Sequence, residues 1–154
     1  MSASLSIGIE GHGSASVVLA ITKAAFASTS AYAHPSSALN EKLDGLRASG
    51  DEFLVARSQG RAIAAARLRM KAPALEFTRL AVLPALQGRG VGEAMLDHIE
   101  GLARERAMHE VRCAARSSMP DNRPFYLRRG YEVLGYEHVY GVPNLRTRLR
   151  LVLS

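Results

Sequence analysis

The sequence contains a single cysteine, Cys113, and no long hydrophobic run. One cysteine excludes an intramolecular disulfide framework and a zinc site built from several cysteines. No segment approaches the ~20 apolar residues that a membrane-spanning helix needs. The first 22 residues also lack the Lys or Arg that a secretory signal carries at its start. We therefore expect a cytoplasmic protein.

The composition is that of a globular chain with an excess of positive charge. The length of 154 residues suits a single domain spanning residues 1–154, and the hydrophobic fraction of 47% excludes disorder. The 20 Lys and Arg outnumber the 14 Asp and Glu, which gives a net charge of +6. Such a chain favours an anionic partner, with nucleic acid or a membrane surface as the general candidates.

Apolar spacing and turn signals predict an α/β domain with a mixed sheet. Two short helices are expected within residues 14–49, and a longer amphipathic helix starts near Val91, with Glu100 on its exposed face beside Arg104. No convincing strand can be placed around residues 5–9. The expected strands are residues 53–57, 61–70, 75–83, 111–115, 131–140 and 145–153, with a short helix over 122–129.

A glycine-rich turn, residues 87–92 (QGRGVG), lies where a strand ends and the amphipathic helix begins. Glycines allow positive φ angles and close approach of a ligand to the backbone, and the first amides of a helix favour negative charge. This arrangement suits a phosphate or pyrophosphate. The segment lacks the G-x-x-x-x-G-K-[ST] pattern of a P-loop, and its G-x-G-x-G spacing differs from the G-x-G-x-x-G of a Rossmann site.

The turn matches the pattern Q/R-x-x-G-x-G/A through Gln87, Gly90 and Gly92. Together with residues 79–84 (RLAVLP) before it and residues 122–131 (NRPFYLRRGY) after it, the chain resembles the GNAT superfamily of acetyl-CoA-dependent N-acetyltransferases. The resemblance covers about residues 51–137. It implies a GNAT fold, in which a mixed, mostly antiparallel sheet of six to seven strands is flanked by about four helices.

The resemblance implies an acetyl-CoA site along the turn and the strand before it. In the family, the CoA pyrophosphate lies on the amides of the turn, and the pantetheine arm pairs with backbone groups of a strand that usually carries a bulge. The backbone amide of Leu80 is our candidate for stabilising charge on the thioester oxygen. The implied cofactor-binding residues are Leu80, Val82, Gln87, Gly88, Arg89, Gly90, Val91, Gly92, Asn122 and Tyr126.

A catalytic acid and a base are also implied. Tyr126 corresponds to the family tyrosine that protonates the departing CoA thiolate; packing of Phe125 and Tyr126 into the core is the alternative.

The acceptor ammonium, of pKa ~10.4, must lose a proton before attack. Glu76, eleven residues before Gln87 (87 − 76), is placed like the general base of protein-acetylating relatives. A water chain is the alternative, with Glu76 then a solvated or ion-paired carboxylate. In an unbulged strand Glu76 and Leu80 would share a face.

Other polar residues are weaker candidates for the acceptor pocket, and a plain surface position is favoured for each: Tyr32, His34, Tyr136, His138 and Tyr140. Cys113 is expected to be a small buried residue on an interior strand. Arg89, Arg123, Arg128 and Arg129 cluster in sequence around the cofactor motifs, where they can meet CoA phosphates. Arg146, Arg148 and Arg150 alternate with apolar residues and are expected to form a solvated strand face.

These observations predict an acyltransferase that moves an acetyl group from acetyl-CoA to a primary amine, by direct attack in a ternary complex. The acceptor, a small molecule or a peptide, is not specified by the sequence, no metal is implied, and a homodimer would be common among relatives. One alternative is a CoA-binding module without catalysis. The other is a basic nucleic-acid-binding domain, although the sequence has no clear recognition helix or zinc pattern.

Overall fold

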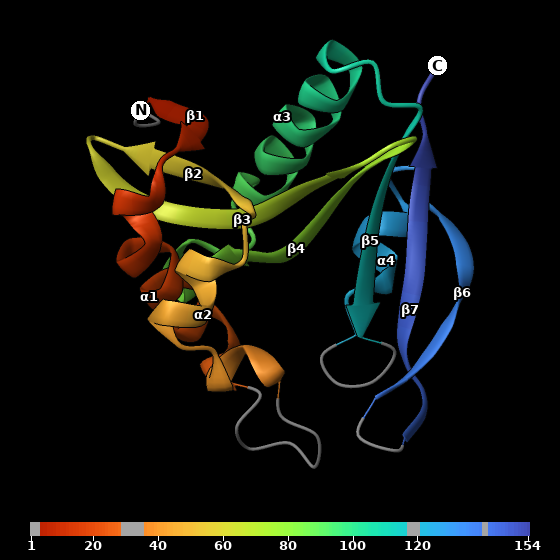
Figure 1. The fold of residues 1–154 in the computed structure, drawn as a ribbon, viewed down its shortest axis with the longest axis horizontal. Helices are drawn as coiled ribbons and strands as arrows, with labels where there is room; N and C mark the ends of the chain where they lie inside the picture. Colours follow the sequence, from red (N-terminus) through yellow and green to blue (C-terminus); the bar gives the residue numbers. More distant parts are fainter. Residues whose placement is uncertain (1–3, 29–35, 117–120, 140–141) are drawn as a thin grey trace.

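A computed structural model describes residues 4–28, 36–116, 121–139 and 142–154 (Figure 1). Within these residues, seven strands form one sheet in the order β1-β2-β3-β4-β5-β7-β6, and only the β4–β5 pair is parallel. The strands are β1 (Leu5–Glu10), β2 (Glu52–Ser58), β3 (Arg61–Lys71), β4 (Ala74–Val82), β5 (Glu110–Arg116), β6 (Glu132–Val139) and β7 (Val142–Val152). The α-helices are α1 (Ala15–Phe26), α2 (Leu43–Ala48), α3 (Val91–Glu105) and α4 (Arg123–Leu127).

The predicted fold class is confirmed, since a mixed, mostly antiparallel sheet is flanked by helices on both faces. The expected strands and helices appear with small shifts at their ends. Strand β1, which could not be placed from the sequence, pairs along its whole length with β2. Short 3₁₀ turns supplement the helices at His12–Ser14, Ser37–Asn40 and Pro84–Leu86. None of the described helices is long and apolar enough to cross a membrane.

The sheet separates two hydrophobic cores. The larger lies under α3 and α4, where Leu75, Met95, Ile99 and Leu149 are fully buried and Cys113 is also buried, as predicted. The smaller lies under α1 and α2 and includes Val18. Burial of these apolar side chains is the main driving force that fixes the helices to the sheet.

Glu100 corrects the expectation for helix α3. Its side chain is buried rather than exposed, and its carboxylate accepts hydrogen bonds from Tyr131 Oη (3.0 Å) and Arg129 Nη2 (3.1 Å). These two partners, which follow α4 in the chain, supply the polar contacts that a buried carboxylate needs. The predicted pairing of Glu100 with Arg104 along the helix is therefore replaced by a link from α3 to the segment between α4 and β6.

The sheet opens between its two central strands. β4 and β5 are paired only from Ala74 with Glu110 to Glu76 with Arg112. Beyond these residues the two strands diverge, as Figure 1 shows, and β5 continues beside β7 while β4 continues beside β3. The last residues of β4 therefore carry backbone groups on an edge that no described strand covers.

Candidate active site

A β-bulge in β4 lies at the point where the sheet opens. Ala65 pairs with Ala81 and Arg67 pairs with Thr78, so Ala66 lies opposite two residues, Arg79 and Leu80. Arg79 has a φ of +55°, in the left-handed region that residues with a Cβ seldom adopt. The extra residue changes which side chains share a face of the strand.

The bulge that the family resemblance implies is present, and it means that Glu76 and Leu80 do not share a face as they would in an unbulged strand. Before it, Phe77 points into the core under α3; after it, Leu80 packs against that same core while Ala81 points toward α1. Glu76, next to Phe77 in an extended strand, therefore lies on the α1–α2 side of β4, opposite the side chain of Leu80.

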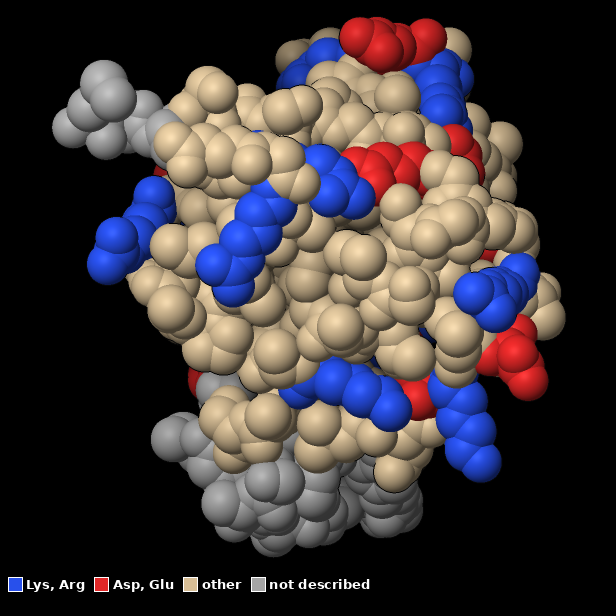
Figure 2. Space-filling model, turned by 90° about the vertical axis from the view of Figure 1, so that its left-hand side faces the viewer, with Lys and Arg blue, Asp and Glu red and all other residues tan. Residues whose placement is uncertain are grey.

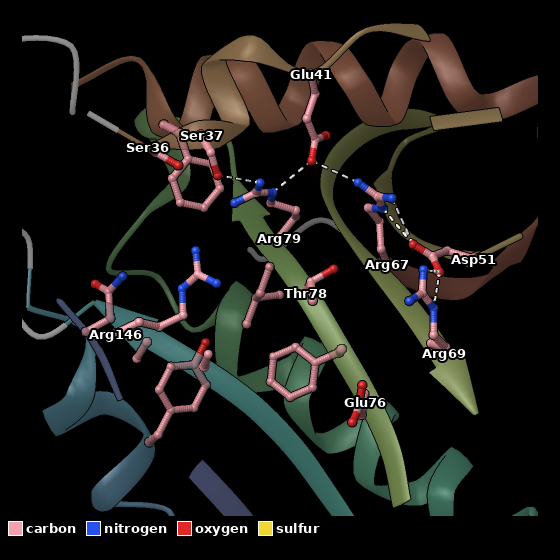
Figure 3. Close-up of a pocket in the computed structure, with 17 residues that line it drawn as sticks. Ser36, Ser37, Glu41, Asp51, Arg67, Arg69, Glu76, Thr78, Arg79 and Arg146 are labelled. Atoms are coloured by element: carbon pink, nitrogen blue, oxygen red, sulfur yellow. Dashed lines mark hydrogen bonds and ion pairs between the residues drawn. The ribbon is translucent and has the colours of Figure 1, made fainter. Parts of the chain in front are cut away.

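A cavity of about 290 Å³ lies in the opening between β4 and β5. Its walls come from the end of α1, the segment around Ser37, strands β3, β4, β5 and β7, and helix α4. Figure 3 shows these side chains converging on the cavity from both sides of β4. Four predicted site residues line it: Glu76, Leu80, Asn122 and Tyr126.

Tyr126 reaches the cavity from α4 and is only 7% exposed. Its ring lies against those of Phe77, Phe125 and Tyr131, with centroids 6.2, 5.1 and 5.6 Å away. Burial raises the pKa of the Tyr126 phenol, and Cys113 adds to the effect. The catalytic and the packing interpretations of Tyr126 are therefore compatible, because one edge of a buried ring faces the cavity.

Glu76 is less enclosed. Its side chain is 32% exposed, and its Oε1 lies 3.4 Å from Nζ of Lys71, the last residue of β3. It thus lines the cavity while making the ion pair that the sequence left as an alternative. Asn122 is the N-cap residue of α4, but its side chain makes no capping hydrogen bond. Asp121 Oδ1 instead accepts from the backbone N–H of Arg123 (3.0 Å).

The glycine-rich turn joins β4 to α3. Gly88 and Gly90 have φ angles of +76° and +84°, and no atom lies within 4 Å of where a Cβ would project from either residue. Gly92 packs closely on α4, since a Cβ there would lie 3.4 Å from Phe125 Cζ. Gln87 turns back to β4 and donates from Nε2 to the carbonyl of Val82 (3.0 Å). The turn thus exposes backbone, although none of its residues lines the cavity. Arg89 is exposed and Val91 packs against the core.

An arginine–carboxylate network forms the wall of the cavity opposite α4, and sequence reasoning missed it. Arg67 and Arg69 donate to the two carboxylate oxygens of Asp51 at 2.9 and 2.8 Å. Glu41 Oε1 accepts from both Arg67 and Arg79, each at 2.8 Å (Figure 3). The sequence feature that could have indicated this network is the pair Arg67 and Arg69, which lie two residues apart on one face of the otherwise apolar strand β3.

The arginines expected on a solvated strand face divide into two groups. Arg146 lines the cavity, contrary to that expectation. Arg148 and Arg150 lie beside Glu137 (3.9 Å) and Glu132 (2.6 Å).

Of the arginines expected near CoA phosphates, two already have carboxylate partners. Arg123 binds Asp121, and Arg129 binds Asp97 together with Glu100.

The weaker pocket candidates contribute little. Tyr136 and His138 are exposed on β6, away from the described walls of the cavity. Tyr32, His34 and Tyr140 lie outside the described residues.

Residues 49–133 match the family model described as Acetyltransferase (GNAT) domain. The match covers more than half of the chain, and it contains the bulged strand, the glycine-rich turn and α4. The chain belongs to the GNAT acetyltransferase family. A search of curated proteins finds no match.

Solved structures show the same fold over nearly the whole chain. A GCN5-related N-acetyltransferase from Rhodopseudomonas palustris is 25% identical, with 99% of each chain covered and a TM-score of 0.75. The PaiA N-acetyltransferase from Thermoplasma acidophilum, solved in complex with coenzyme A, is 15% identical, with 97% of this chain and 99% of that chain covered and a TM-score of 0.77. The ribosomal-protein-S18-alanine N-acetyltransferase from Escherichia coli is 17% identical, with coverages of 98% and 95% and a TM-score of 0.75.

Proposed function

We propose that the protein transfers an acetyl group from acetyl-CoA to a primary amine bound in the cavity between β4 and β5. The observation that carries the proposal is the bulge in β4. It turns Leu80 and Glu76 to opposite faces of the strand at the point where the sheet opens, with Tyr126 on the facing helix. A donor lying in the opening and an acceptor entering from the α1–α2 side would meet at this place.

The residues present fit acetyl-CoA. The open backbone at Gly88 and Gly90, followed by the first amides of α3, suits a pyrophosphate, because these N–H groups and the helix dipole favour negative charge. Beyond Glu76, the edge of β4 that faces β5 can pair with the amide groups of a pantetheine arm. Gln87 supports this arrangement by holding the turn against Val82. Asn122, Arg89 and Val91 complete the proposed cofactor contacts.

Acetyl-CoA supplies the acetyl group: the C–N bond to the amine forms, the C–S bond breaks, and the sulfur leaves as a thiolate. The amide N–H of Leu80 is the candidate to stabilise the carbonyl oxygen as it gains negative charge. Glu76 is the candidate to take the proton that the ammonium must lose, directly or through water. Tyr126 is the candidate to donate a proton to the sulfur, and its burial holds that proton until the thiolate forms.

Replacing Tyr126 by phenylalanine tests the proposal. We expect Tyr126→Phe to lower kcat by about a hundredfold or more, because the general acid is lost, while the Kd for acetyl-CoA changes little. Tyr136→Phe is the matched control, since Tyr136 is exposed and outside the cavity wall, and it should retain full activity. Turnover is measured by release of free CoA thiol, and binding by calorimetry.

Two results would contradict the proposal. If the wild-type protein fails to bind acetyl-CoA at low salt, the site has been assigned wrongly. If it binds acetyl-CoA but acetylates no member of a broad amine and peptide panel, the chain is a CoA-binding module without catalysis.

A further inference from the structure

The cavity is lined by more arginines than its carboxylates neutralise. Among its described walls, the basic side chains are Arg67, Arg69, Arg79 and Arg146, and the acidic ones are Glu41, Asp51 and Glu76. Glu76 already faces Lys71, which lies outside the lining. Arg146 likewise has a carboxylate neighbour outside the lining, Glu137. Four guanidinium groups against three carboxylates therefore leave the lining with a surplus of one positive charge.

Asp51 and Glu41 are both bound by arginines of the wall itself. Asp51 is only 5% exposed, and each of its oxygens is held by one arginine, Arg67 or Arg69. Glu41 Oε1 accepts from both Arg67 and Arg79. These pairs fix the wall in place, and both oxygens of Asp51 and Oε1 of Glu41 are already taken by arginines.

Arg79 and Arg146 still have donors that face the cavity. Arg79 uses Nε for Glu41 and Nη2 for Ser37 Oγ (2.8 Å), so within the described residues its Nη1 has no hydrogen-bond partner. Arg146 has one carboxylate neighbour in the described part of the chain, Glu137, and only at 3.8 Å. Figure 3 shows the guanidinium group of Arg146 extending across the cavity toward the side on which Arg79 lies.

Arg79 is also held where a side chain is costly to place. Its φ of +55° is a strained conformation for a residue with a Cβ, and such strain tends to be kept at functional sites. The hydrogen bonds to Glu41 and Ser37 hold the guanidinium group in one orientation. A fixed arginine loses less entropy on binding a carboxylate than a mobile lysine would.

We propose that the acceptor is a small amino acid-like molecule, with a carboxylate held between Arg79 and Arg146 and its primary amine directed toward Glu76. The inference rests on the proposed acetyl transfer and specifies its substrate class. A guanidinium group pairs with a carboxylate through parallel hydrogen bonds. The volume of about 290 Å³ is at the lower limit for ligand pockets and must also hold the acetyl end of the donor, so the acceptor is small. A polyamine fits this lining less well, because it would place further positive charge beside the arginines.

The test compares amines that differ only in the anionic group. Steady-state acetylation is measured for the standard amino acids, each beside its carboxamide, with O-phosphoethanolamine and spermidine as further arms. We expect the best amino acid to have a KM at least about tenfold below that of its carboxamide, because a charge-assisted hydrogen bond is lost in the amide. Spermidine should be a poor substrate.

Arg146→Gln and Arg148→Gln form a matched pair of variants. Each removes one positive charge from β7 beside Glu137, but only Arg146 lines the cavity. Arg146→Gln should raise the KM for the amino acid by about ten- to hundredfold and leave its carboxamide and acetyl-CoA unchanged. Arg148→Gln should retain the wild-type preference.

The outcomes separate the inference from the proposed function. A protein that does not bind acetyl-CoA overturns both. A protein that binds acetyl-CoA but prefers carboxamides or spermidine, prefers O-phosphoethanolamine to every amino acid, or neither acetylates nor binds any amino acid in calorimetry with CoA present, overturns the inference alone. An equal rise in the KM for acetyl-CoA in Arg146→Gln would also overturn it, because Arg146 would then belong to the donor site.

Discussion

At the scale of single residues, Glu76 lies in the cavity wall and also forms an ion pair. Its carboxylate faces the cavity and also lies 3.4 Å from Lys71, whose side chain is 56% exposed. An ion pair this open to solvent contributes little to stability. Loss of this ion pair is therefore a minor structural change, and the proposed role of Glu76 in proton transfer can be measured separately.

We predict that Glu76→Gln lowers kcat/KM at pH 7 by about a hundredfold, because the amine then loses its proton without a positioned base. The deficit should shrink as the pH rises toward ~10, where the free amine forms unaided. The measurement is the pH profile of kcat/KM for both proteins.

Lys71→Gln breaks the same ion pair without removing the carboxylate, and it should leave the profile almost unchanged. If Glu76→Gln instead retains wild-type kcat/KM at pH 7, a water chain carries the proton, and Glu76 is a strand carboxylate paired with Lys71.

At the scale of elements, helix α3 has one glycine at its N-cap, Gly90, and another in its interior, Gly101, and the two have different effects on its stability. Gly90, the N-cap, has a φ of +84°, whereas Gly101 lies inside the helix with no atom within 4 Å of its Cβ position. Gly90 needs the conformational freedom of glycine, whereas glycine at position 101 only lowers the helix propensity of α3. Alanine should therefore have opposite effects at the two positions.

We predict that Gly90→Ala lowers the free energy of unfolding by about 1–2 kcal/mol, because alanine is strained at positive φ. It should also weaken acetyl-CoA binding, since the new methyl group projects into the open space above the turn. Gly101→Ala should raise the free energy of unfolding by about 0.5–1 kcal/mol and leave binding unchanged. Denaturant unfolding and calorimetry measure the two effects. Equal acetyl-CoA affinity in both variants would contradict the assignment of the turn to the phosphates.

The elements that sequence reasoning found are those with local signals. The amphipathic pattern of α3, the glycines of the turn and the alternation in β7 each lie within one stretch of chain. Strand β1 was missed because Leu5 and Ile9 stay exposed at the sheet edge and its pairing with β2 joins residues far apart in sequence. The position of the bulge was equally hidden, because it is defined by the register of β4 against β3.

The same reason explains which parts of the site could be predicted. The proposed donor side follows motifs, so Tyr126, Leu80 and the turn could be predicted as candidates. The proposed acceptor side is assembled from β3, β4 and β7 and from the segment around Ser37, and only the folded sheet brings Arg67, Arg79 and Arg146 to one cavity. Nothing in the alternation of β7 distinguishes Arg146 from Arg148.

At the scale of the whole molecule, the positive charge on the face shown in Figure 2 is scattered rather than gathered in one patch. Figure 2 shows the face that forms the left-hand side of Figure 1, where lysines and arginines are scattered among uncharged residues and several lie beside carboxylates. A nucleic-acid surface would instead need a continuous basic patch, and this face has none among its described residues. Many arginines of the molecule form ion pairs with carboxylates, and these pairs make the stability of the fold depend on pH in acid.

Arginine partners hold carboxyl groups in their charged form. The hydrogen bond from Arg57, opposed by partial burial, lowers the pKa of Glu10 to about 2, and similar arginine contacts lower the pKa values of Glu52, Glu110 and Asp121. A carboxyl group whose pKa is lower in the folded state stabilises the fold above its unfolded pKa, near 4.3. That contribution is lost as the pH falls from about 4.3 toward 2.

We therefore predict that the free energy of unfolding decreases between about pH 4.5 and pH 2, and that Glu10→Gln removes part of this dependence. At pH 7 the variant should be less stable than the wild-type protein, because Arg57 on β2 loses the charged partner that ties it to the end of β1. Near pH 2 the two proteins should be equally stable. Glu105→Gln, an exposed change at the end of α3, is the control and should follow the wild-type curve. Denaturant unfolding at several pH values measures the difference, and a constant gap from pH 7 to pH 2 would show that Glu10 acts through packing rather than through its charge.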